Sequence, residues 1–135
     1  AHWDALGAID FTTVEVWAKG GLVTYYLLFV MEIATRRVHL ISVQLPPRSP
    51  NLNAHVERFH RSLKEDCLNR MIFFGEKSPR NSVSTFLDHF HMERNHQGLA
   101  NRVIEPGAEV NRRDGEVLCR DRLGGMLRYY YRKAA

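Results

Sequence analysis

The sequence contains few cysteines, no long apolar run and, over a long internal stretch, no aspartate. Its two cysteines, Cys67 and Cys119, have no CxxC partners, and Cys67 falls on an apolar helix stripe, so a reduced, buried thiol is expected. A reduced thiol favours a cytoplasmic location. The most apolar run, residues 22–34, is interrupted by Glu32 and is too short to span a bilayer. We therefore expect no signal peptide, no membrane anchor and no membrane partner.

The charge balance is mildly basic. The chain of 135 residues has 19 Lys and Arg against 15 Asp and Glu, which gives a net charge of +4. This excess is compatible with nucleic-acid binding without proving it. Hydrophobic residues make up 44% of the chain and charged residues 25%, so we expect one folded domain with a small core.

Three runs rich in β-branched and aromatic residues, at 8–17, 22–33 and 37–43, predict strands. The connections between them are short, which favours an antiparallel meander. Asp10 lies inside the first run, where an acidic residue fits poorly unless the position has a use. The alternative is a solvent-facing carboxylate at the edge of the sheet.

Residues 45–68 predict a proline-rich lead-in followed by a helix, which Asn51 or Asn53 can cap. Glu57 lies beside an apolar stripe and shares its side of the helix with several polar and basic residues. A carboxylate flanked by cations suits a metal ion and a phosphate backbone. The alternative is a solvated face with Glu57 paired to Arg61 one turn on. The stripe consists of Leu52, Val56, Phe59, Leu63, Cys67 and Met71, and the residues on the side of Glu57 are Asn53, His60, Arg61 and Lys64.

A second amphipathic helix is expected to begin near Ser78-Pro79 and to end at Gly98. Its predicted buried residues are Val83, Phe86, Leu87 and Phe90. The C-terminal region places arginines around Tyr129–Tyr131, an arrangement that either binds nucleic acid or forms a strand with a solvated basic edge. The basic residues concerned are Arg120, Arg122, Arg128, Arg132 and Lys133.

Four segments of the chain carry a family resemblance: residues 8–13 (AIDFTT), 34–39 (ATRRVH), 49–59 (SPNLNAHVERF) and 89–99 (HFHMERNHQGL). They resemble the integrase catalytic core family, especially the transposases and integrase-like proteins of bacterial insertion sequences. The resemblance implies a ribonuclease H-like fold, a divalent metal ion, and an Asp-Asp-Glu triad that cuts and joins DNA strands. Asp10 matches the first aspartate and Glu57 the glutamate, and the resemblance implies DNA contacts at Asn53, His60, Arg61 and Lys64.

One departure concerns the second aspartate of the triad, because the sequence has no aspartate between Asp10 and Asp66. Glu15 points to the opposite face of its strand and Glu32 lies at the far end of the next strand, so neither replaces it. We infer an internal deletion near Ser42–Gln44. The expected fold is an α/β (α+β), ribonuclease H-like fold, reduced to a three-stranded antiparallel meander, two main helices and a basic C-terminal tail. Residues 1–105 would form the truncated core and residues 106–135 the basic extension.

The functional hypothesis follows from both the matches and the departure. We expect a DNA integration or transposition protein that resembles a metal-dependent strand transferase but has little or no activity of its own. Asp10 and Glu57 would hold at most one Mg²⁺ or Mn²⁺, weakly. The alternative is a non-catalytic remnant that binds DNA or a partner. The expected partners are DNA and either a second copy, through the exposed edge of the first strand, or a full-length transposase.

Overall fold

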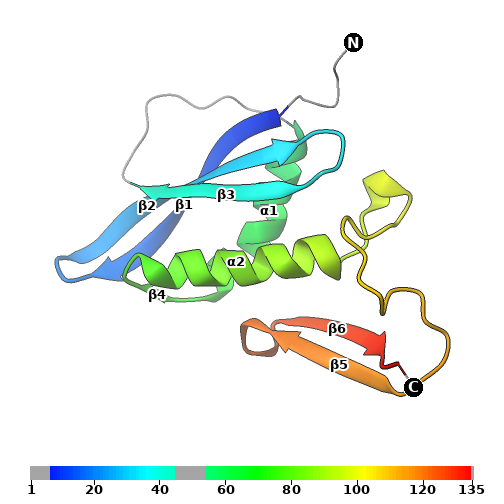
Figure 1. The fold of residues 1–135 in the computed structure, drawn as a ribbon. Helices are drawn as coiled ribbons and strands as arrows, with labels where there is room; N and C mark the ends of the chain where they lie inside the picture. Colours follow the sequence, from blue (N-terminus) through cyan, green and yellow to red (C-terminus); the bar gives the residue numbers. More distant parts are fainter. Residues whose placement is uncertain (1–6, 45–53, 135) are drawn as a thin grey trace, which may run out of the picture. The chain divides into compact units, whose positions relative to one another are not determined.

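The computed structural model describes residues 7–44 and 54–134 and has a mixed α+β architecture (Figure 1). Its contacts divide the chain into two compact units, residues 1–84 and 85–135, with the boundary inside the second long helix. The longer elements are β1 (Gly7–Ala18), β2 (Gly21–Glu32), β3 (Val38–Gln44), α1 (Ala54–Asp66), β4 (Phe73–Phe74), α2 (Lys77–Met92), β5 (Val117–Arg122) and β6 (Leu127–Arg132). Short 3-10 turns lie at Leu68–Arg70, Gln97–Leu99 and Leu123–Gly125.

The sheet of the first unit has the order β3-β2-β1-β4. The three predicted strands are present and pair antiparallel, but the sheet is larger than the expected three-stranded meander, because a fourth strand pairs in parallel with β1 and makes the sheet mixed. After α1 the chain returns to the edge of β1, where Phe73 pairs in parallel with Val16. Both side chains are fully buried, so apolar burial accounts for this pairing.

The core of the first unit lies between one face of this sheet and α1. The even-numbered residues of β1 from 8 to 16 are buried and the odd-numbered ones mostly are not, as the pleat of a half-buried strand requires. The predicted stripe of α1 is confirmed at Val56, Phe59, Leu63 and Cys67, all of which are buried. Phe59 packs edge-to-face on Phe29 of β2, with ring centroids 5.1 Å apart. Leu52 and the capping residues Asn51 and Asn53 lie outside the described residues.

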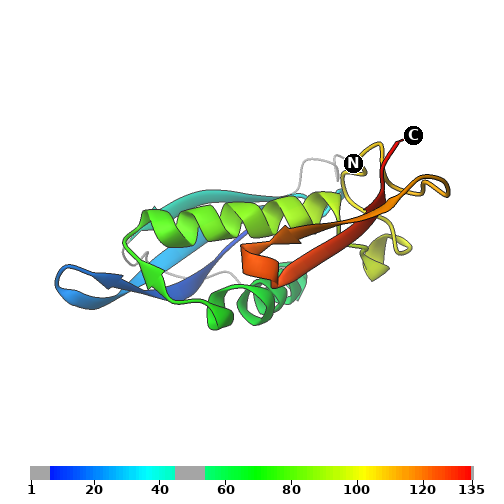
Figure 2. The ribbon, with the colours of Figure 1, turned by 90° about the horizontal axis from the view of Figure 1, so that it is seen from below.

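Helix α2 begins at Lys77, close to the predicted start, but ends at Met92, earlier than the predicted Gly98. The four side chains predicted to be buried on it are buried. The C-terminal region, expected to be a basic tail with at most one strand, forms an antiparallel hairpin of β5 and β6 (Figure 2). Within the described part of the chain, no helix is long and apolar enough to cross a membrane.

Candidate functional site

Asp10 and Glu57, far apart in the sequence, line one pocket of about 500 Å³. Strand β1 contributes residues 10–13 to this pocket, and α1 contributes the residues on the side of Glu57. The residues of α1 and the turn after it are Glu57, His60, Arg61, Lys64, Glu65 and Asn69. Five of the six site residues predicted from the sequence, Asp10 among them, line this pocket, whereas Asn53 lies outside the described residues.

Asp10 is held in place by its own strand. Its side chain points to the core side of β1, and the residue is 4% exposed. Its Oδ1 atom accepts a hydrogen bond of 2.8 Å from the backbone N–H of Phe11. The carbonyl of Trp17 faces the β4 side of β1, since it accepts a hydrogen bond from the backbone N–H of Gly75. Alternate residues of a strand direct their backbone groups to the same side, so the Phe11 N–H also faces the β4 side. Since β4 pairs only with Val16 and Trp17, the Asp10 carboxylate satisfies a donor on the unpaired part of the β1 edge.

His60 stands beside Asp10 and is buried. Its Nδ1 atom lies 3.7 Å from Asp10 Oδ2, too far for a good hydrogen bond, and its ring lies near the ring of Phe29. Its Nε2 atom is buried and has no hydrogen-bond partner among the described residues. Burial lowers the pKa of His60 and nearby Lys64 adds to this, while Asp10 opposes it. A largely neutral imidazole results, with little surface to offer to DNA.

The charged side chains on the outer side of α1 are exposed to different degrees. Glu57 and Arg61 are exposed and Lys64 is half-buried. Glu57 and Arg61 form no ion pair among the described residues, although the sequence allowed one. The Arg61 guanidinium and the Lys64 ammonium therefore both remain available to an anion at the pocket. Sequence reasoning missed Glu65, although its position eight residues after Glu57 places it on the same helix face.

The described part of the chain offers few ligands for a metal ion. No group of three or more His, Cys, Asp or Glu side chains among the described residues is placed to hold a metal ion. Glu65 is the third carboxylate of the pocket, but eight residues of helix separate it from Glu57 by about 12 Å, too far to share an ion. Asp10 and Glu57 are the carboxylates of the pocket that could hold a metal ion.

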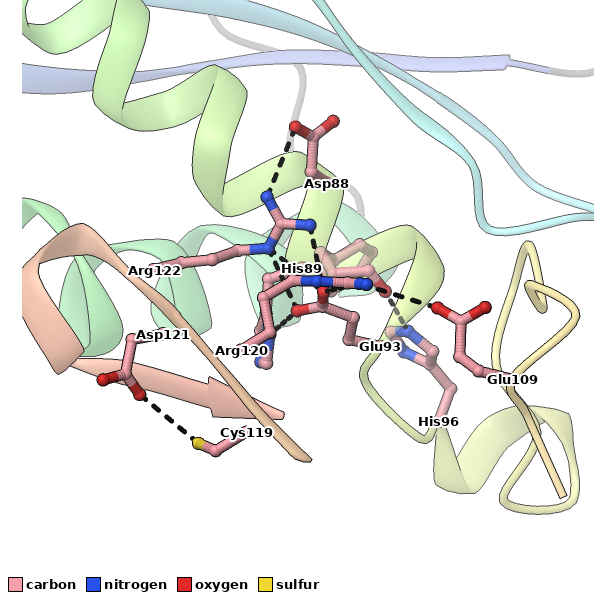
Figure 3. Close-up of polar contacts among 10 residues, drawn as sticks. Asp88, His89, Glu93, His96, Glu109, Cys119, Arg120, Asp121 and Arg122 are labelled. Carbon is pink, nitrogen blue, oxygen red and sulfur yellow. Dashed lines mark hydrogen bonds and ion pairs between the residues drawn. The ribbon is translucent and has the colours of Figure 1, made fainter. Parts of the chain in front are cut away.

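A second cluster of charges surrounds Glu93 in the second unit (Figure 3). The Glu93 side chain is 1% exposed and accepts hydrogen bonds of 2.9 Å from Arg120 and 2.9–3.2 Å from Arg122. His89 Nδ1 lies 2.8 Å from the Oε2 atom of Glu93. Burial alone would raise the pKa of Glu93, but the hydrogen bonds from Arg122, Arg120 and His89 outweigh burial and lower it to about 2.

This cluster revises the interpretation of the C-terminal arginines. Arg120 and Arg122 bind Glu93, at the end of α2, and so attach β5 to that end instead of facing solvent. Arg128 lies 3.4 Å from Asp121, and Arg132 donates to the carbonyl of Gly115. Internal partners therefore engage four of the five basic residues that the sequence suggested as a nucleic-acid surface.

His96 follows the end of α2 and contacts that helix. His96 Nε2 donates to the carbonyl of Phe90 at 2.8 Å, and the two rings meet edge-to-face at 4.5 Å. Burial lowers the pKa of His96, and Arg94 adds to this, although the bond to Phe90 opposes it. The histidine thus supports the chain where α2 ends.

Comparison with known protein families gives one match. Residues 42–103, somewhat less than half of the chain, match the family model described as integrase core domain. These residues are similar to part of an integrase core. The matching segment includes Glu57, the rest of α1 and all of α2, whereas Asp10 lies before it. The family generally uses divalent metal ions and acts on DNA. No curated protein and no solved structure matches the chain.

Proposed function

We propose that this chain is a DNA integration or transposition protein that binds the DNA backbone at the pocket between β1 and α1. The observation that carries the proposal is the meeting of Asp10 and Glu57 at one pocket, beside Arg61 and Lys64. Two cations next to two carboxylates suit a phosphate that is bound together with a metal ion. The integrase core match of residues 42–103 supports the same function.

Each side chain then has a distinct task. Arg61 and Lys64 bind phosphate oxygens and fix the position of the DNA. Asp10 and Glu57 would hold one Mg²⁺, which when bound polarises a phosphoryl oxygen. The Phe11 N–H orients Asp10 by holding its Oδ1 atom. His60 excludes water from the other side of the Asp10 carboxylate, because its ring is buried.

We further propose that strand transfer by this chain alone is slight. Phosphoryl transfer with two ions needs them about 3.5–4 Å apart, which takes a third well-placed acid. The resemblance places the missing aspartate on a strand beside β1. The edge of β1 from Gly7 to Glu15 pairs with no strand in the described part of the chain. An internal deletion near Ser42–Gln44 accounts for both the missing acid and the open edge, and leaves residues 1–105 as a reduced core.

A second candidate is a non-catalytic module that docks on DNA or on a full-length transposase, and the small donor set favours it. The two candidates differ in one measurable property. Nicking of a DNA end that needs Mg²⁺ or Mn²⁺ and is lost in Asp10→Asn would establish the enzyme. Salt-sensitive binding without nicking would establish the module.

DNA binding can be tested by fluorescence anisotropy with a labelled duplex at several salt concentrations. The variant Arg61→Ala/Lys64→Ala should bind more weakly on every sequence, and its salt dependence should fall by about one unit of slope per lost phosphate contact. Arg80→Ala is the matched control, because it removes an exposed cation from α2. Equal loss in both variants, or no loss in either, would overturn the assignment of the pocket.

A further inference from the structure

Four large apolar side chains are exposed at the end of the sheet where β1, β2 and β4 meet. Trp17 is 49% exposed, Leu22 54%, Ile72 70% and Phe74 68%. We call these four residues the Trp17 patch. The turn between β1 and β2 and the short strand β4 lie at the same end of the sheet (Figure 1).

The strand register makes the patch continuous. Trp17 pairs with Leu22 on β2 and with Phe74 on β4, and directly paired residues project on the same face of a sheet. The neighbours Val16 and Phe73 are buried on the other face, where the core lies. Ile72 precedes Phe74 by two residues and shares its side of the chain. The patch therefore faces away from the core across three adjacent strands.

The size of the patch is informative. Single exposed apolar residues are ordinary, but a contiguous group of large ones marks an interaction surface. From the usual areas of these side chains, the four leave roughly 450 Å² of apolar surface in water. Two such patches face to face would bury about 900 Å², slightly below the roughly 1,000 Å² expected of a stable interface, so the contact would be weak and transient. Aromatic anchors such as Trp17 and Phe74 are typical of the centres of interfaces.

Two charged residues that flank Trp17 favour a second copy of the chain over DNA as the partner. Glu15 and Lys19, both exposed, precede and follow Trp17 by two residues. The two charges are opposite and lie on either side of an uncharged centre. In a two-fold symmetric contact, Lys19 of one copy can approach Glu15 of the other, whereas DNA would be repelled by Glu15 and gain nothing from the apolar centre.

We propose that a second copy of this chain covers the Trp17 patch, in a two-fold contact that packs Trp17 of each copy on Phe74 of the other. The sequence suggested self-association through the open edge of β1, whereas this inference places it on a face of the sheet, and it does not depend on the proposed DNA binding at the pocket. The modest area predicts a reversible dimer that dissociates at about micromolar concentration.

Sedimentation velocity of the full chain from about 1 to about 100 μM should show a monomer–dimer equilibrium. Phe74→Glu should weaken association by about tenfold or more, whereas Val117→Glu, which places the same charge at another exposed apolar residue, should leave it unchanged. In a Trp3→Phe background, the emission of Trp17 should shift to the blue as the dimer forms. A monomer at all concentrations, or equal effects of the two variants, would overturn the proposal.

A charge swap keeps the test decisive even if Phe74→Glu fails to fold. Lys19→Glu should weaken the dimer, and Glu15→Lys added to the same chain should restore it, because the pair is then reversed in both copies. Failure of the swap to restore association would count against a second copy as the partner. DNA binding is measured separately, so Arg61→Ala/Lys64→Ala should still dimerise. Failure of the DNA-binding proposal and failure of the dimer proposal can therefore be told apart, because each is measured in its own assay.

Discussion

Replacement of Glu93 by Gln should destabilise the second unit more than its single lost charge suggests. Glu93 is buried and receives hydrogen bonds from Arg120, Arg122 and His89. The amide can accept some of these bonds, but it leaves the two guanidinium groups with only their longer ion pairs, Arg120 with Glu109 at 3.5 Å and Arg122 with Asp88 at 3.7 Å. The variant therefore leaves the positive charge of the cluster only partly compensated.

The size of the effect follows from the pKa of Glu93. A fall from 4.5 to about 2 on folding means that the charged carboxylate stabilises the fold by about 3 kcal/mol at neutral pH. The Arg120 and Arg122 side chains are 36% and 17% exposed, so water replaces part of what they lose. We therefore expect Glu93→Gln to lower the free energy of unfolding by about 2–3 kcal/mol. Because the folded pKa is lowered, this contribution is present above pH 4.5 and is lost as the pH falls toward 2.

Urea unfolding and amide hydrogen exchange provide the assay. The loss of protection in Glu93→Gln should be concentrated in the amides of β5 and β6, because Arg120 and Arg122 attach that hairpin to the end of α2. Glu76→Gln is the control. It breaks an exposed pair with Arg80 at 3.6 Å and should cost less than about 0.5 kcal/mol.

A double-mutant cycle with Arg122→Gln isolates the interaction itself. The coupling energy between positions 93 and 122 should be at least about 1 kcal/mol, since Arg122 makes several bonds to the carboxylate. The reasoning would be refuted if Glu93→Gln were no less stable than Glu76→Gln, or if amide hydrogen exchange in β5 and β6 were unchanged. So would a wild-type protein whose stability is flat between pH 4.5 and pH 2.

Three further results are expected. Electron paramagnetic resonance titration with Mn²⁺ should show at most one bound ion, and Glu57→Gln should remove it, whereas Glu76→Gln should not. Asp10→Asn should keep the Phe11 amide protected from exchange, because the amide oxygen still accepts its bond, while Asp10→Ala should expose it; equal exchange in both would contradict this. With a thiol reagent near pH 8, one thiol per native chain should react well before the other. Cys119 is exposed, although desolvation and Asp121 raise its pKa, whereas burial, with a smaller contribution from Asp66, raises the pKa of Cys67 to about 11.

The sequence predicted those features that have a local signal. The β-branched runs located β1, β2 and β3, and the spacing of Val56, Phe59 and Leu63 located the buried face of α1. The sequence also predicted that Asp10 and Glu57 would share a site, but this came from the family resemblance, since spacing alone left a solvated helix face open.

Features that depend on distant pairing were missed. Strand β4 has only two residues, and its register depends on Phe73 meeting Val16 from far along the chain. Glu93 meets its arginine partners 27 and 29 residues later, so no periodic pattern reveals the cluster. The same limit explains His60: helical spacing placed it on the side of Glu57, but the depth at which Phe29 and Phe59 cover its ring is a property of the packed core.

The bond between Asp10 and the Phe11 N–H joins the chemistry of the site to the state of the sheet. A strand paired along β1 at this point would take that N–H into its own ladder and leave both carboxylate oxygens free for a metal ion. Among the described residues, the edge of β1 is open from Gly7 to Glu15, and one oxygen of the Asp10 carboxylate accepts the hydrogen bond from the Phe11 N–H at this edge. On the proposed deletion, loss of a strand here would impair the site in two ways: it would remove an acid, and it would leave one of the two remaining acids bonded to the open edge. A point substitution that introduces a second aspartate should therefore not produce strand transfer, because no strand in the described part of the chain would hold it beside Asp10.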